Sequence, residues 1–141
     1  MFGGIIKSSL KIEPLMISKN ISELEIYQLS KELSKQSWEI YQKIPKYLKT
    51  SFGNQFLSAV DSIGANIAEG YGRYHYKDSL NFFYYSRGSL WESCFWLELL
   101  LQREIIDQSL FDELKRFLIN LSVKLNNFIQ SLRSQMLRKD G

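Results

Sequence analysis

Side chains that can bind phosphates and bases gather in one short stretch between two long apolar segments. Residues 71–77 contain the aromatic and basic set Arg73, Tyr74, His75, Tyr76 and Lys77. Guanidinium and ammonium groups bind phosphates, and tyrosine rings stack on bases. Three more cations lie near the C-terminus, at Arg133, Arg138 and Lys139. These residue types predict a surface that binds nucleic acid, if the fold brings the two stretches together; the alternative is a solvated bundle end with packed tyrosines.

The sequence has few of the residues that a metal site or a catalytic nucleophile needs. A di-iron bundle needs Glu-x-x-His on two helices, and the only histidine is His75. If the segments on either side of residue 73 form a helical hairpin, Glu69 and Glu92 lie on the order of 20 Å apart, too far to share an ion. Cys94 is flanked by apolar residues, where a thiol packs as a small hydrophobe. We therefore expect no catalytic residue, no metal site and no cofactor.

Composition bounds the class of protein. The chain has 141 residues, a single cysteine and a net charge of +3, which predicts one domain in a reducing, cytoplasmic compartment. No apolar run approaches the ~18 residues that a membrane span needs. The charge is uneven, because both ends of the chain are basic and the middle is acidic.

Apolar periodicity predicts four helices with short connections. The first runs from Ser22 to Lys43, with Ser22 and Glu25 as a capping box, and stops before Pro45. The second begins with a cap at Thr50 or Ser51 and ends at Gly70.

The last two helices are longer. The third covers residues 77–105 and is apolar nearly all round, which suggests burial against a partner chain. The fourth runs from Asp107 or Ser109 to about Leu137 along a leucine-rich seam. The predicted fold is all-α, an antiparallel up-down-up-down four-helix bundle.

The bundle is expected to cover residues 21–137. Residues 1–20 are predicted to be a flexible tail, with an arm packed on a neighbouring subunit as the alternative, and 138–141 a short C-terminal tail. Met16 is an alternative start to Met1.

Small residues mark the hairpin between the second and third helices. Gly70 and Gly72 are expected to end the second helix in the left-handed conformation. Folding the chain about residues 73–74 places Ala59 opposite Gly88, and Ser58 opposite Ser89. Close packing there explains a mid-helix glycine, and Gly88→Leu is then expected to unfold or rearrange the hairpin.

Three polar residues share one face at the end of the second helix: Asn66, Glu69 and Arg73. One interpretation is a network that closes the helix terminus, in which Glu69 pairs with Arg73 or with exposed N–H groups of the hairpin. The other is that Arg73 faces a ligand.

Two strings carry a family resemblance, SIGANIAEGYGR at residues 62–73 and GSLWE at residues 88–92. With Asn66, Glu69, Gly70, Gly72, Gly88, Ser89 and Glu92, the chain resembles the bacterial four helix bundle protein family. Founding members of that family are encoded by intervening sequences in large-subunit ribosomal RNA genes. Gly64 stands where the family pattern leads us to expect proline.

The resemblance implies more than the fold. The family is similar to the accessory protein of diversity-generating retroelements, a homopentamer that binds nucleic acid and a reverse transcriptase. We therefore expect a non-enzymatic homo-oligomeric scaffold that binds RNA or DNA, alongside a reverse transcriptase or other protein. The alternative is a structural or protein-interaction module without nucleic acid.

Overall fold

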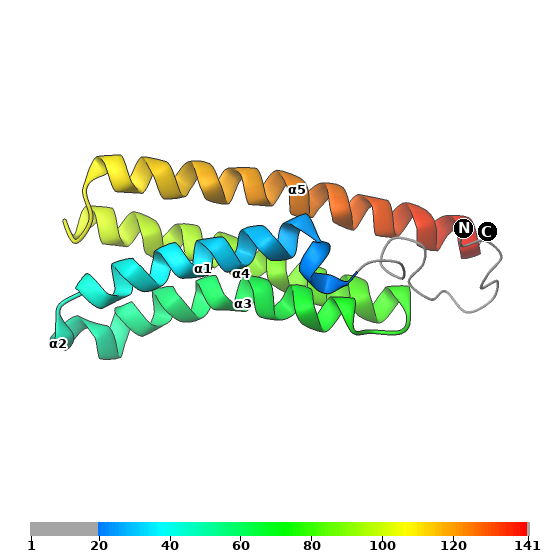
Figure 1. Ribbon diagram of the computed structural model, residues 1–141, viewed down its shortest axis with the longest axis horizontal. Coiled ribbons are helices and arrows are strands. Elements are labelled where there is room, and N and C mark those ends of the chain that lie inside the picture. Colours follow the sequence, from blue (N-terminus) through cyan, green and yellow to red (C-terminus); the bar gives the residue numbers. More distant parts are fainter. Residues whose placement is uncertain (1–19, 141) are drawn as a thin grey trace.

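The chain folds into four long helices that lie side by side (Figure 1). The computed structural model describes residues 20–140. The long helices are α1 (Glu25–Lys43), α3 (Asn54–Tyr71), α4 (Tyr76–Gln102) and α5 (Gln108–Asp140). Short helical turns precede them, namely η1 (Ile21–Glu23), α2 (Lys46–Leu48) and η2 (Lys49–Gly53). The all-α bundle is confirmed, α5 continues past the predicted end near Leu137, and the predicted N-terminal tail falls outside the described residues except for Asn20.

Hydrogen bonds between helices fix the direction of each neighbour. From α4 to α3, the Ser79 hydroxyl donates to the Gly70 carbonyl and the Ser86 hydroxyl to the Ile63 carbonyl, both at 2.8 Å. Residue numbers rise along α4 as they fall along α3, so the two helices are antiparallel. The same rule holds for α1 with α3 and for α4 with α5, through the pairs Ser34–Asp61, Tyr41–Asn54, Tyr76–Gln135 and Arg87–Asn126.

The start of α1 differs from the predicted capping box. Ser22 lies in the turn η1, where its N–H is capped by the Asn20 side chain at 3.0 Å. The N-cap residue of α1 is Leu24, which makes no side-chain cap. The predicted box is therefore wrong, because a separate 3₁₀ turn comes first. The end of α1 at Lys43 is confirmed, since Ile44 is extended before Pro45.

The start of α3 also differs from the predicted cap at Thr50 or Ser51. The chain is helical from Lys46 onward and passes through a π-helical turn, η2, before α3 begins at Asn54. Neither Thr50 nor Ser51 caps α3, and the Ser51 hydroxyl donates to the Leu48 carbonyl instead. A turn that continues one helix into the next leaves few free N–H groups to cap.

Gly70 and Gly72 do not end α3 as predicted. Gly72 is the C-cap at φ −80°, a right-handed conformation, and Gly70 lies within the helix. Gly70 is instead needed for packing, because a Cβ built there would lie 2.9 Å from the Phe83 ring.

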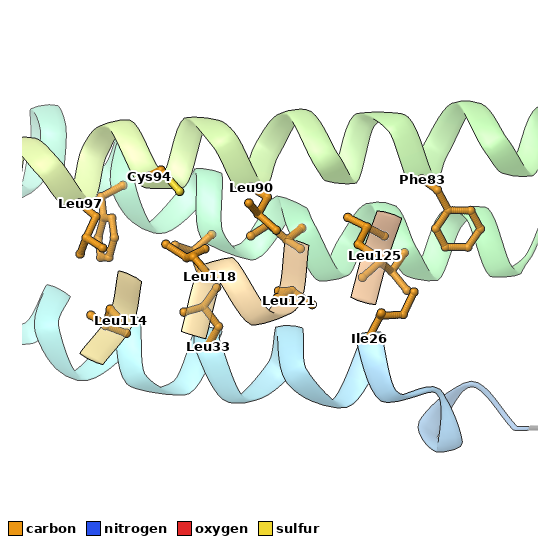
Figure 2. Close-up of a cluster of buried hydrophobic side chains, with 14 of the residues drawn as sticks. Ile26, Leu33, Phe83, Leu90, Cys94, Leu97, Leu114, Leu118, Leu121 and Leu125 are labelled. Atoms are coloured by element: carbon orange, nitrogen blue, oxygen red, sulfur yellow. The ribbon is translucent and has the colours of Figure 1, made fainter. Parts of the chain in front are cut away.

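The core lies where the apolar faces of the four long helices meet (Figure 2). Figure 2 shows leucines of α5 between side chains of α1 and α4. Along the leucine-rich seam of α5 five leucines are buried and Phe128 is half-buried; the leucines are Leu114, Leu118, Leu121, Leu125 and Leu132.

Serines set the spacing between α3 and α4. Ser79, Ser86 and Ser93 recur every seven residues on α4 and are 0% exposed. Gly88 was predicted at this contact, but it is exposed, and a Cβ there would meet nothing within 4 Å. The predicted alignment is about two residues out of register, and Gly88 lies on the outer face of α4.

Candidate nucleic-acid interface

The turn between α3 and α4 lies at the same end of the bundle as the C-terminus of α5 (Figure 1). A hydrogen bond joins them, from the Tyr76 hydroxyl to Gln135 Oε1 at 2.8 Å. The Ser79 hydroxyl also holds the first turn of α4 to the end of α3. The two basic stretches predicted to meet are therefore at one end of the molecule.

Tyr76 does not belong to the surface at this end. Its side chain is 0% exposed and is the largest of the fully buried side chains. A buried ring cannot stack on a base, so Tyr76 is a core residue that ties α4 to α5. Tyr74 is the exposed tyrosine here, at 55%, with its ring 4.9 Å from the His75 ring in an edge-on contact.

Arg73 is held by two contacts. Its guanidinium donates to Glu69 Oε2 at 3.0 Å, and its Cζ lies 4.5 Å from the centre of the Phe82 ring. The pairing of Glu69 with Arg73 at the end of α3 is thus confirmed. Asn66 is not part of it, because its amide donates to the Ser62 carbonyl one turn back. Since Arg73 remains 43% exposed, its outer edge faces solvent.

The other cations of the predicted surface come from α4 and α5. Lys77, Arg133 and Arg138 are exposed, and Lys139 is half-buried. Arg138 and Lys139 lie in the last turn of α5, where positive charge stabilises the helix dipole. Together with Arg73 and Tyr74, these residues form what we call the basic end.

Acidic residues lie near the basic end as well. Glu23 and Asp78 are exposed, the latter in the first turn of α4. Glu25 is occupied elsewhere, since its carboxylate pairs with Lys124 at 3.1 Å.

The remaining motif residues have local structural roles. Glu92 accepts a hydrogen bond from the Trp96 indole at 3.0 Å, and Ser89 accepts one through its carbonyl from the Ser93 hydroxyl. Ala59 is buried in α3. None of these side chains lies at the basic end.

Cys94 is a buried thiol in the core, beside Leu90 and Leu97 on α4 (Figure 2). Burial raises the pKa of its thiol, the Lys115 charge lowers that pKa, and the Glu98 charge raises it. The net effect is upward, which disfavours the reactive thiolate.

Neither a metal cluster nor a membrane span is present among the described residues. Residues 20–140 hold no group of three or more His, Cys, Asp or Glu side chains placed to bind a metal. No helix within that range is long and apolar enough to cross a membrane.

One surface feature was not anticipated from the sequence. Ile119 and Val123 of α5 are each 52% exposed, although both are large and aliphatic. They lie off the leucine seam, and an exposed position beside a buried seam carries little signal until the neighbouring helix is placed.

Fold and site together define a small antiparallel helical bundle with a basic, partly aromatic end. The chain belongs to the 23S rRNA-intervening sequence protein family, whose model matches residues 22–127. A comparison with curated proteins gave no match.

A solved structure supports the fold. The chain is similar to a Bacteroides thetaiotaomicron protein of unknown function from the S23 ribosomal protein family. The TM-score is 0.67 at 23% identity, over 74% of this chain and 97% of that one. At this identity the likeness concerns the fold alone.

Proposed function

We propose that the protein is a non-enzymatic, homo-oligomeric scaffold that associates with RNA or DNA through the basic end. The observation that carries the proposal is the hydrogen bond between Tyr76 and Gln135. It joins the start of α4 to the end of α5, and so gathers cations from distant parts of the chain.

The side chains of the basic end suit a phosphate backbone. Exposed arginine and lysine neutralise phosphates without reading sequence, and the exposed Tyr74 ring offers a face for a base. The Glu69–Arg73 pair is exposed, and such pairs contribute only about 0–1 kcal/mol. Replacing the Glu69 carboxylate with a phosphate as the partner of Arg73 therefore costs little free energy.

Assembly would multiply a weak site. In a homo-oligomer each basic end is repeated, so modest affinity per site becomes avidity along one strand. The family resemblance implies a homopentamer and a partner such as a reverse transcriptase, and both remain part of the proposal.

A salt titration with matched double variants tests the nucleic-acid part. Arg133→Ala with Arg138→Ala removes two charges at the basic end, and Lys43→Ala with Lys46→Ala removes two at the opposite end. For generic single-stranded RNA and DNA, the first pair should weaken binding and lower the slope of log K against log salt by about 1.4. The second pair should leave the slope unchanged.

Equal effects of the two double variants would mean that only net charge matters, and would contradict the proposed site.

A protein-interaction module without nucleic acid is the second candidate, favoured by the exposed apolar side chains of α4 and α5. Its signature is an intact oligomer that binds neither RNA nor DNA at low salt.

A further inference from the structure

Four large apolar side chains are exposed on one face of the bundle. Their exposed fractions are 59% for Trp91 and 52% each for Phe95, Ile119 and Val123. Trp91 and Phe95 come from α4, while Ile119 and Val123 come from α5. We refer to this set as the α4/α5 patch.

Two polar links between the helices locate the patch. Arg87 bonds to Asn126 at 3.2 Å, and Glu98 pairs with Lys115 at 3.4 Å. Because α4 and α5 are antiparallel, residues 88–97 of α4 lie beside residues 116–125 of α5. Each link therefore borders one end of the patch, and the exposed side chains of both helices form one continuous surface between them.

Gly88 lies on the outer side of α4, beside the first of these links. A Cβ at Gly88 would meet nothing within 4 Å, so the glycine is not required by packing inside the chain. A mid-helix glycine costs about 0.5–1 kcal/mol against alanine. The absent side chain of Gly88 leaves space next to Trp91, where the backbone of another chain can approach α4 closely. Gly88 would then have a role outside the monomer.

We propose that the α4/α5 patch is the contact face for a second copy of this chain. This inference rests on the oligomeric part of the proposed function and assigns it a surface. Each of the four half-exposed apolar side chains, two aromatic and two aliphatic, leaves on the order of 100 Å² uncovered, so together they offer roughly 400 Å² of apolar surface. The largest apolar patch on a typical monomer is about 300–600 Å² and is often functional, and roughly 400 Å² is about half of the ~800 Å² that one partner contributes to a standard interface.

Charge at the rim favours a second copy over a strongly charged partner. The rim carries both signs, with Arg87, Lys115 and Arg116 against Glu92 and Glu98, of which Glu98 pairs with Lys115. A nucleic acid or an acidic membrane would leave the two glutamates facing like charge, and a basic partner would do the same to the arginines. A second copy brings both signs to the contact, so that each can meet its opposite.

The test compares two equally polar substitutions at tryptophans of similar exposure. Trp91→Glu alters the patch, whereas Trp38→Glu alters an aromatic side chain on α1 that is 49% exposed. Ile119→Glu, on the other helix of the patch, is the second test variant. Solution mass is measured against concentration for the full chain, with helical content checked by circular dichroism.

We expect the wild type and Trp38→Glu to form the same oligomer. Trp91→Glu and Ile119→Glu should shift the mass toward the 16.6 kDa monomer, with dissociation at a concentration about tenfold higher or more. An oligomer that survives both patch variants but not Trp38→Glu would overturn the assigned face while leaving the scaffold intact. A monomeric wild type would overturn the face and the oligomeric part of the proposed function together, and loss of RNA and DNA binding alone would leave the face standing.

Discussion

Two glycines of the α3–α4 hairpin have opposite surroundings. Gly70 is buried, and a Cβ there would come within 2.9 Å of the Phe83 ring. Gly88 is exposed and has free space on its outer side. Both lie in helical segments, so both carry the entropic cost of glycine, but within the chain only Gly70 gains a packing contact in return.

A paired substitution separates these two roles. In the monomer, at a protein concentration too low for assembly, Gly88→Ala should raise the free energy of unfolding by about 0.5–1 kcal/mol, because alanine restricts the unfolded chain and meets no atom of its own chain. Gly70→Ala should lower it by about 1–3 kcal/mol, because the Phe83 ring must move. Urea denaturation at one protein concentration measures both changes. A Gly88→Ala variant less stable than Gly70→Ala would contradict the packing described.

The C-terminal end of α4 requires a backbone conformation that the residue at that position, Glu104, does not favour. The Ile105 N–H donates to the Leu100 carbonyl and the Glu104 N–H to the Leu101 carbonyl, both at 2.9 Å, which is the Schellman pattern. This pattern needs a residue with positive φ just after the helix, and Glu104 has φ 60°. Glycine usually occupies that position, so the end of α4 stores strain. Asp107 then caps α5, accepting the Leu110 N–H at 2.9 Å.

Relieving that strain should stabilise the turn. Glu104→Gly is expected to raise the unfolding free energy by about 1 kcal/mol, since glycine adopts positive φ without a Cβ clash. Glu104→Ala is the matched control, because it removes the charge and keeps the Cβ. If the alanine variant gains as much in thermal denaturation as the glycine variant, the carboxylate and not the backbone is responsible.

At the scale of the whole molecule, distant parts of the chain meet at the basic end. The Tyr76 hydroxyl and Gln135 are 59 residues apart in sequence and bond at 2.8 Å. This contact connects the α3–α4 turn to the last turns of α5, and the proposed nucleic-acid surface depends on it.

A double-mutant cycle tests the strength of that connection. Tyr76→Phe leaves the Gln135 carbonyl without this donor and should cost about 1–2 kcal/mol of unfolding free energy. In combination with Gln135→Met, the loss should be smaller than the sum of the two single losses by roughly 1 kcal/mol. Additive losses in chemical denaturation would show that the two side chains act independently.

Prediction from the sequence succeeded where a pattern repeats over many residues. The buried faces of α1, α3 and α5 follow from apolar spacing, because burying a continuous stripe outweighs any single local preference. Helix boundaries failed where the signal is a single residue. Ser22 lies in a separate turn, and Glu104 adopts a positive φ that only a glycine at this position would have indicated in the sequence.

The candidate site was predicted in part for the same reason. An up-down topology is enough to bring Arg73 and Arg133 to one end of the bundle. Whether Tyr76 faces the core or solvent depends on the rotation of α4 about its axis, and the neighbouring Tyr74, which lies in the turn before α4, gives no indication of that rotation.

The amino-acid sequence by itself determined that four amphipathic helices pack into a bundle, since their apolar stripes have no other way to leave water. Only the tertiary structure decided which small residues are packed and which are open. Ser86 and Gly88 are two positions apart on α4, yet the first is buried against α3 and the second faces outward. A helix turns about 100° per residue, so two residues two positions apart point about 200° away from each other, and an alignment that is two residues off mistakes an outward position for an inward one.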